Sequence, residues 1–218
     1  SVCRKIMIEL FYFDFNFWRA DILRLCLSLE GIPFKYKRLA RNSWPKEKKK
    51  FPFGQLPVLV IDNQMYAHTH TLARYCAKKS VLYDTNERKS LIIDQVLDWA
   101  NEITNLVAPS IRAAMREKNL EKSKKLREHF VKNDLLNWFT YLEDLLNKSS
   151  KNKKFFTDNF SIADITAWRV IYWFTSGRLD MVEKSFIDKL PVLKKYYLGI
   201  NNYDPLIRLK EFREITST

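Results

Sequence analysis

The stretch from Phe51 to Asn63 constrains the fold of this chain more than any other. It reads Phe-Pro-Phe-Gly-Gln-Leu-Pro-Val-Leu-Val-Ile-Asp-Asn, so a Pro/Gly turn leads into a short β-branched strand that an Asp-Asn turn closes. Pro57 stands at the first residue of that strand, where its missing N–H matters least. The Leu56–Pro57 bond is either an ordinary bond before an edge strand or a cis peptide bond. In the cis case the backbone polar groups of Leu56 would turn outward, where an extended ligand could pair with them.

The residues on either side place this strand in a small α/β unit. Apolar patterns predict a strand over 6–13, a helix over 19–30 that Gly31 ends, and a second strand over 34–39. A strand, a helix and a strand make a right-handed βαβ unit with parallel strands. Two strands, 58–61 and 64–67, then form a hairpin. A helix through Cys76 follows, with Thr69 or Thr71 as its cap.

Strand patterns disappear after residue 80, and helical ones replace them. The predicted helices cover 86–115 (which Pro109 must kink or break), 121–147, a segment from the capping box at Ser161 to Ser176, and shorter pieces at 181–190, 191–201 and 205–214. The predicted fold class is therefore α/β plus all-α. We expect an α/β domain over 1–80, a linker over 81–86 and an all-helical domain over 87–218.

The chain is strongly basic, with a formal net charge of +13. Clusters at 46–50, 122–125 and 151–154 could meet nucleic acid, an anionic membrane or acidic ligands. Acidic residues lie near each cluster and no nucleic-acid-binding motif accompanies them, which favours an ordinary solvated surface and no nucleic-acid partner.

Cysteine use and hydropathy point to a cytoplasmic protein. Cys3, Cys26 and Cys76 are an odd and widely spaced set, which favours reduced thiols over disulfides or a zinc cluster. Cys26 and Cys76 fall on apolar helix faces and are predicted core residues. No apolar run approaches the roughly 20 residues of a membrane span. The first residues show no signal-peptide pattern, although a trimmed leader stays open because the chain begins at Ser1.

The order of these motifs resembles the cytosolic glutathione transferases, and the tyrosine-using sigma, mu and alpha branch is the most similar. The resemblance covers nearly the whole chain and rests on Tyr12-Phe13-Asp14, Arg19 to Leu25, Trp44-Pro45, Pro52 to Leu59, Ala73-Arg74-Tyr75 and the capping box at Ser161. It implies a thioredoxin-like amino-terminal domain, βαβ-ββα with a mixed four-stranded sheet, before the helical domain. It also implies a detoxifying transferase that uses glutathione as co-substrate without a metal, acts on a small apolar electrophile and forms a homodimer.

By this resemblance Tyr12 would donate a hydrogen bond to the glutathione sulfur. A free thiol has a pKa near 8.5, and a hydrogen bond to the charged form lowers that pKa. Arg19 would approach the sulfur and the second substrate. The alternative for Tyr12 is a strand-end aromatic residue that only packs.

The remaining glutathione contacts follow from matching positions. Leu56, between Gln55 and Pro57, would pair with the cysteinyl backbone, and Thr69 at a helix amino terminus would bind the γ-glutamyl carboxylate. Trp44 and Lys48 would hold the glycine carboxylate end. In a partner subunit, Glu102 or Asn101 would meet the amino group of the ligand.

Three departures from the family pattern concern this site. The segment between the Tyr-Phe-Asp motif and the first helix normally carries an Arg-Gly pair, but here it reads Phe15-Asn16-Phe17-Trp18 and is one residue longer. An alignment without that insertion puts Phe13 at the tyrosine position. His68-Thr69 replaces Gln-Ser, and Gln55 stands where close relatives often carry lysine. His68 either contacts the ligand or caps the helix, because His68 and His70 alone make a weak metal site.

The predicted second-substrate pocket is apolar, and its candidates could equally be core residues. They are Phe13, Phe15, Phe17, Ile103, Val107 and Ile111.

Two classes of function stay open. The first is a glutathione transferase, from which a glutathione-dependent isomerase cannot be separated by sequence. The second is a weakly catalytic or non-catalytic relative that binds apolar ligands or protein partners, which the altered segment 15–18 favours. Nucleic-acid binding is a distant third, and salt-sensitive binding would mark it.

Overall fold

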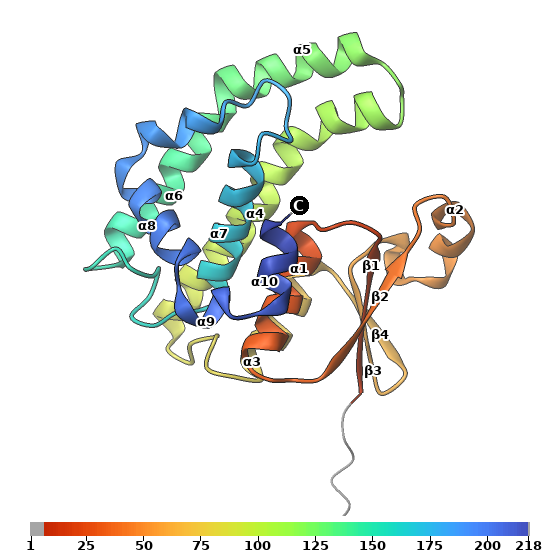
Figure 1. Cartoon of the computed structure of the whole chain (residues 1–218), viewed down its shortest axis with the longest axis horizontal. Coiled ribbons are helices and arrows are strands. Elements are labelled where there is room, and N and C mark those ends of the chain that lie inside the picture. Colours follow the sequence, from red (N-terminus) through yellow and green to blue (C-terminus); the bar gives the residue numbers. More distant parts are fainter. Residues whose placement is uncertain (1–6, 218) are drawn as a thin grey trace, which may run out of the picture. The chain divides into compact units, whose positions relative to one another are not determined.

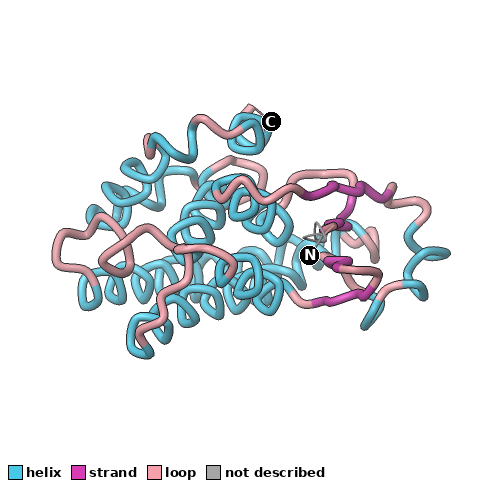
Figure 2. The backbone as a smooth tube through the Cα atoms, turned by 90° about the horizontal axis from the view of Figure 1, so that it is seen from below, coloured by secondary structure: helices cyan, strands magenta, loops and turns pink. Residues whose placement is uncertain are grey.

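The computed structural model describes residues 7–217 (Figures 1 and 2). Contacts between Cα atoms divide the chain into two compact units. The first comprises the chain up to Tyr83 together with the segment from Tyr203 onward, and the second is Asp84–Asn202. The division lies at the linker predicted over 81–86. The carboxyl-terminal segment, however, groups with the α/β unit, and not with the helical domain predicted over 87–218.

The first unit is built on the predicted mixed four-stranded sheet. Its strands lie in the order β2-β1-β3-β4, with β1 parallel to β2 and antiparallel to β3, and β3 antiparallel to β4. The strands are β1 (Ile8–Phe13), β2 (Phe34–Leu39), β3 (Val58–Ile61) and β4 (Gln64–Ala67), and the helices are α1 (Trp18–Leu29), α2 (Trp44–Glu47), α3 (Thr69–Lys78), α9 (Asp204–Ile207) and α10 (Lys210–Thr216). Single 3₁₀ turns, η1 (Lys48–Lys50) and η2 (Pro52–Gly54), join α2 to β3. The βαβ-ββα order is thus confirmed.

The two faces of this sheet carry different coverings. Along β1, Ile8, Leu10 and Tyr12 are buried while the residues between them are half-buried, as the two-residue period of a strand requires. The long helices α1 and α3 pack side by side against one face (Figure 1). On the other face, Phe11 packs against Phe51, with 5.5 Å between ring centroids.

A buried ion-pair cluster explains why the carboxyl-terminal segment joins the first unit. The guanidinium of Arg24 on α1 lies 3.4 Å from the carboxylate of Asp21 and also pairs with Glu214 on α10. Arg24 is 3% exposed and Asp21 is fully buried. A buried carboxylate is strongly destabilising without a partner, so Arg24 is needed where it lies. Nothing in the local pattern of 205–214 indicated this attachment.

The second unit is built from helices that lie between Glu87 and Asn201 and are joined by loops. Its helices are α4 (Glu87–Met115), α5 (Leu120–Phe130), α6 (Leu136–Ser149), α7 (Ile162–Thr175) and α8 (Pro191–Asn201), with a π-helical turn η3 (Val131–Leu135) between α5 and α6 and a 3₁₀ helix η4 (Lys184–Lys189) before α8. The helix predicted over 121–147 is therefore one continuous helical run with a π turn inside it. Of the two outcomes predicted at Pro109, the break does not occur, because α4 continues through this residue, and a kink stays a prediction.

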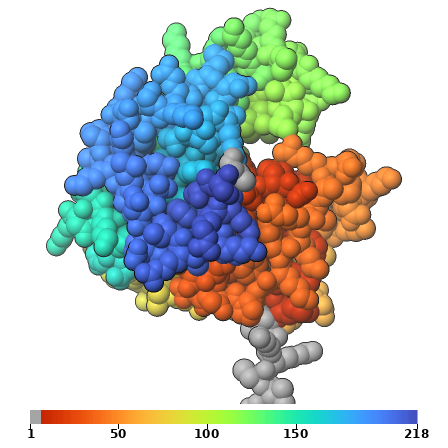
Figure 3. Space-filling model, viewed as in Figure 1, coloured from red at the N-terminus to blue at the C-terminus, as the bar shows by residue number. Residues whose placement is uncertain are grey.

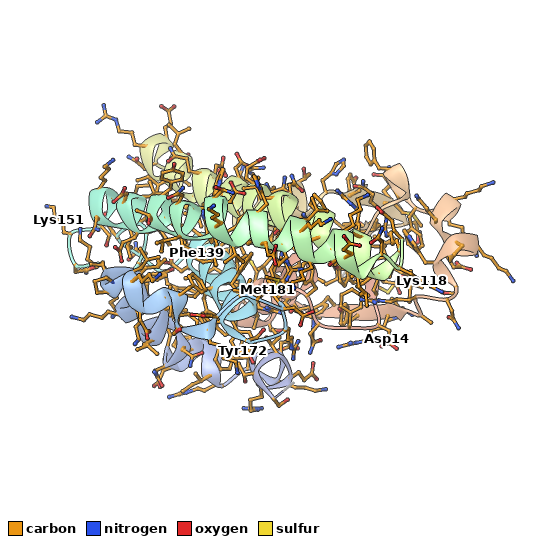
Figure 4. The ribbon with its side chains drawn as sticks, turned by 90° about the horizontal axis from the view of Figure 1, so that it is seen from above. Asp14, Lys118, Phe139, Lys151, Tyr172 and Met181 are labelled. Carbon is orange, nitrogen blue, oxygen red and sulfur yellow. The ribbon has the colours of Figure 1, made fainter. Side chains whose placement is uncertain are left out.

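Aromatic packing and a capping box hold the second unit together. Phe139 of α6, labelled in Figure 4, contacts the rings of Phe174 on α7 at 5.2 Å and Phe186 on η4 at 4.8 Å between centroids. The predicted capping box is confirmed, since the Ser161 hydroxyl accepts a hydrogen bond from the Ala163 N–H and Asp164 closes the box. Capping satisfies N–H groups that a helix leaves without intrahelical partners.

The described cysteines are core residues, as predicted. Cys26 on α1 and Cys76 on α3 are free thiols without solvent exposure, and Cys3 lies outside the described residues. Burial raises the pKa of the Cys76 thiol to about 12 and that of Cys26 well above its ordinary value. Both therefore stay protonated at neutral pH. No helix within residues 7–217 has the length and apolarity to cross a bilayer.

Candidate functional site

Tyr12 faces the side of the sheet on which α1 and α3 lie. Its side chain is 3% exposed, and its ring lies 5.4 Å from that of Phe13 and 5.7 Å from that of Phe15. Burial raises the pKa of the Tyr12 phenol well above its ordinary value, and the positive charge of Arg19 opposes that shift only in part. The hydroxyl is therefore protonated at neutral pH and acts as a hydrogen-bond donor.

The strand alternation separates Tyr12 from the competing candidate, Phe13. Phe13 points to the opposite face, where its ring meets Trp44 edge-on at 5.1 Å. Tyr12 and Arg19, in contrast, are close enough for each to shift the pKa of the other. Of the two alignments weighed from the sequence, this arrangement favours the one in which Tyr12 is the donor.

Arg19 links Tyr12 to the amino terminus of α3. Its guanidinium donates to the Thr69 hydroxyl across 3.5 Å and covers the ring of Trp18 at 4.7 Å. Burial lowers the pKa of Arg19, and the phenol of Tyr12 raises it. An arginine keeps its charge through such a shift, so a positive group stands between strand β1 and helix α3.

The helix α3 begins at Thr69, which is 5% exposed, with His68 as its N-cap residue. The prediction that Thr69 or Thr71 caps the helix is wrong, because the N-cap lies one residue earlier. The His68 side chain makes no capping hydrogen bond, and its ring packs against that of Phe53 in a tilted arrangement, with 4.3 Å between centroids. No acidic residue stands in the first turn of α3. That turn keeps the N–H groups and positive dipole end that an anion requires.

The Leu56–Pro57 peptide bond is cis, which decides between the two forms left open by the sequence. Both hydrogen-bonded ladders of β3 begin at Val58, so the backbone of Leu56 lies outside them. Gln55 before it is exposed, and Pro57 after it is buried.

Trp44 and Lys48 lie on the segment that leads to this bond. Trp44 is half-buried, and its ring packs against Phe13 and, at 5.7 Å, against Phe51. Lys48 is exposed, and its aliphatic chain lies over Gly54: a Cβ at Gly54 would come within 2.7 Å of Lys48 Cε. The φ of +56° explains the glycine at this position, because the flexible Lys48 chain could move aside whereas a side chain strains this backbone conformation.

The altered segment 15–18 is held by side-chain hydrogen bonds. Asn16 donates to the backbone oxygen of Glu214 at 3.2 Å and accepts from Arg38 at 3.0 Å. Arg41 covers the ring of Phe15 at 4.1 Å, and Phe15 stacks on Phe13 at 5.8 Å. The longer segment is therefore tied to β2 and α10 while Tyr12 stays in β1. Sequence reasoning did not single out Asn16, because its partners are distant in the chain.

The second-substrate candidates divide between the two units. Phe13, Phe15 and Phe17 form a half-buried aromatic series in the first unit, and Phe15 and Phe17 lie 6.4 Å apart. In the second unit Ile103 and Val107 are fully buried on α4, which agrees with the alternative that they are core residues. Ile111 is half-buried. Glu102 is exposed on the same helix. A pocket formed by these residues stays a prediction, as does a role of Glu102 in a partner subunit.

Among residues 7–217, no three His, Cys, Asp or Glu side chains gather closely enough to hold a metal ion.

Comparison with known proteins assigns the chain to a family. A family model described as "Glutathione S-transferase, C-terminal domain" matches residues 104–212, which are 109 of the 218 residues. The chain belongs to the glutathione S-transferase family. Among curated relatives, "Glutathione S-transferase 3" of Caenorhabditis elegans is 28% identical over 60% of this chain. That match spans 63% of the relative's own length. "Glutathione S-transferase 1" of Ascaris suum is 28% identical over 86% of this chain and 94% of its own.

A solved structure of the family extends the likeness to both units. The monomeric glutathione S-transferase Na-GST-3 of the hookworm Necator americanus is 26% identical, with a TM-score of 0.76 over 95% of this chain and 97% of its own. "Hematopoietic prostaglandin D synthase" of Rattus norvegicus is 25% identical over 93% of this chain and 87% of its own. The predicted fold and family are thus confirmed, while the sigma, mu and alpha branch stays a prediction.

Proposed function

We propose that this protein is a glutathione transferase that binds glutathione as a thiolate and adds it to a small apolar electrophile. One observation carries the proposal: the protonated Tyr12 hydroxyl, the Arg19 cation and the Thr69 helix terminus lie together in one compact unit. Membership of the family supports it.

The chemistry follows from the charges at this place. A thiol bound near Tyr12 would lose its proton more easily, because a donated hydrogen bond and a nearby cation both favour the thiolate. Each unit of pKa lowering corresponds to about 1.4 kcal/mol. A phenol that burial keeps protonated is suited to donate, since it cannot itself release a proton at neutral pH.

The rest of the tripeptide would follow the same surface. The γ-glutamyl carboxylate would meet the Thr69 N–H and hydroxyl, beside His68. The cysteinyl backbone would pair with Leu56, between Gln55 and Pro57, as one more strand outside the ladder that begins at Val58. Its glycine carboxylate would meet Lys48 and Trp44.

A detoxifying role, a cytoplasmic location and a homodimer in which Glu102 or Asn101 contacts the neighbour's ligand belong to the same proposal. A gel-filtration mass near one chain of 26.1 kDa would count against the homodimer.

A glutathione-dependent isomerase is the second candidate, because relatives named prostaglandin D synthase match most of this chain. It would use the same thiolate. A binding protein without turnover is the third, since the four-residue segment 15–18 replaces the family's Arg-Gly pair.

A pH titration of the glutathione complex tests the proposal. Thiolate absorbs in the near ultraviolet where thiol does not, so the midpoint of the difference spectrum reports the pKa of the bound sulfur. We expect a midpoint well below the ordinary thiol value of about 8.5, and a return toward that value in Tyr12→Phe. Tyr141→Phe, on the exposed surface of α6, is the matched control. Binding with an unshifted midpoint would leave a binding protein, and no binding would refute the glutathione site.

A further inference from the structure

The positive charge of this chain is concentrated in one short segment. Residues 35–50 contain eight basic side chains and a single acid, Glu47, so this segment carries +7 of the total +13. The basic residues are Lys35, Lys37, Arg38, Arg41, Lys46, Lys48, Lys49 and Lys50.

The sheet register brings part of this charge to one face. Lys35 and Lys37 pair with Glu9 and Phe11 of β1, and paired residues point to the same side of a sheet. Phe11 contacts Phe51, so this is the face covered by the segment from α2 to η2, opposite α1 and α3. We define the basic face as the exposed lysines on these elements other than Lys48, which belongs to the proposed glutathione site. They are Lys35, Lys37, Lys46, Lys49 and Lys50. In Figure 3 the segment after β2, coloured orange, lies at the surface.

Few acids neutralise the basic face. Glu9 lies 3.9 Å from the ammonium of Lys37, and Glu47 lies 2.9 Å from that of Lys50. Five lysines against two carboxylates leave a surplus of three charges.

A second lysine cluster, on α5, provides the contrast. The ammonium groups of Lys122 and Lys125 each lie 2.7 Å from a glutamate carboxylate, and that of Lys124 lies 4.0 Å from Glu128. Of the two lysine-rich surfaces, the one on the sheet is therefore the more poorly compensated.

Apolar side chains are exposed among these lysines. One row across the sheet runs Lys35–Glu9–Val60–Met65, and Met65 is 44% exposed. In the turn η2, Phe53 is 73% exposed, its ring lies 4.3 Å from that of His68, and its φ of +55° is a backbone conformation that costs a bulky residue free energy. Two exposed apolar side chains, Met65 on the sheet and Phe53 in the turn η2, thus accompany the lysines in this part of the first unit.

We propose that the basic face docks on an anionic phospholipid bilayer. Lysines near such a surface are attracted to its headgroups, and Met and Phe side chains enter the boundary between headgroups and acyl chains. Duplex nucleic acid fits less well, because reading it needs a helix or ribbon that enters a groove, and the helix on this face is only Trp44–Glu47.

Vesicle co-sedimentation of the full chain tests this proposal. We expect binding to vesicles that contain phosphatidylserine, little binding to pure phosphatidylcholine, and weaker binding as salt rises. Replacing Lys35, Lys37, Lys46 and Lys49 by Gln should weaken binding about fivefold per lysine, on the order of several hundredfold in total.

A matched variant removes the same charge elsewhere. Replacing Lys118 (labelled in Figure 4), Lys122, Lys124 and Lys125 by Gln removes the same four charges from the turn after α4 and from α5, and should change binding by less than about fivefold. Equal losses in both variants would overturn the proposal, as would no binding to anionic vesicles. Equally tight binding of a duplex oligonucleotide would overturn the proposal and indicate that the partner of the basic face is nucleic acid. The assay needs no glutathione and leaves Lys48 intact, so its outcome is independent of the function proposed above.

Discussion

The carboxylate of Asp164 gives a stability prediction that does not depend on function. Its oxygens accept hydrogen bonds from the backbone N–H groups of Phe156 at 3.0 Å and Ser161 at 2.9 Å. They also accept from the hydroxyls of Tyr196 at 2.9 Å and Ser161 at 3.1 Å. Asp164 is fully buried, and the loss of hydration outweighs these donors and raises its pKa from 3.8 to about 6.

The direction of the pH effect follows from the two pKa values. Because the folded protein binds this proton more tightly than the unfolded chain does, the contribution of Asp164 to the free energy of unfolding falls as pH rises from about 4 to about 6. A difference of roughly two pKa units corresponds to about 3 kcal/mol. Asp164→Asn removes the ionisation and leaves two donors facing an amide NH₂, so it should destabilise the protein most at low pH.

Urea unfolding of both proteins at pH 4 and pH 7 measures the effect. We expect the free-energy gap between the natural protein and Asp164→Asn to be about 2.4 kcal/mol smaller at pH 7 than at pH 4, because part of the effect is already lost below pH 4. Asp158→Asn is the control, because Lys89 holds the pKa of Asp158 below its usual value. The difference in unfolding free energy between the natural protein and Asp158→Asn should therefore be nearly the same at pH 4 and pH 7. A gap for Asp164→Asn that widens toward pH 7 would refute the reasoning, since it would mean that the four donors stabilise the carboxylate more than burial destabilises it.

Three other substitutions test the first unit. Phe53→Asn should raise the free energy of unfolding by about 0.5–1 kcal/mol, because Asn tolerates positive φ and the exposed ring buries little. A decrease in this free energy as large as that caused by Phe51→Asn would contradict the prediction. Arg24→Met should lower the free energy of unfolding by about 3–5 kcal/mol, measured by thermal unfolding, since it removes the cation beside the buried Asp21 carboxylate. A decrease below about 1 kcal/mol would show that this ion pair contributes little to stability. Asn16→Ala should speed amide exchange in α10, and unchanged exchange would mean that other contacts hold this helix.

Local patterns were sufficient for most elements. The strands 34–39, 58–61 and 64–67 and the helix 191–201 have the bounds predicted for them. Their signals are short-range: a two-residue alternation, a turn dipeptide and a proline at the first helical position. The capping box at Ser161 is equally local. Regular patterns of this kind are set by neighbours along the chain, so the sequence alone reveals them.

The tertiary structure decided where distant segments meet. Pro109 does not break α4, because packing on one face of a helix can outweigh one lost backbone hydrogen bond. The choice between Tyr12 and Phe13 depends on which side of the sheet α1 and α3 cover. The attachment of α10 depends on Arg24, whose partner Glu214 is 190 residues away.

The sequence by itself therefore determined the order of elements, the family and the residue types of the proposed glutathione site. Only the tertiary structure brought Tyr12, Arg19 and Thr69 together and tied the altered segment to α10 through Asn16. The physical reason is that strand and helix periods express local backbone geometry, whereas a buried polar side chain must find a partner wherever the fold supplies one.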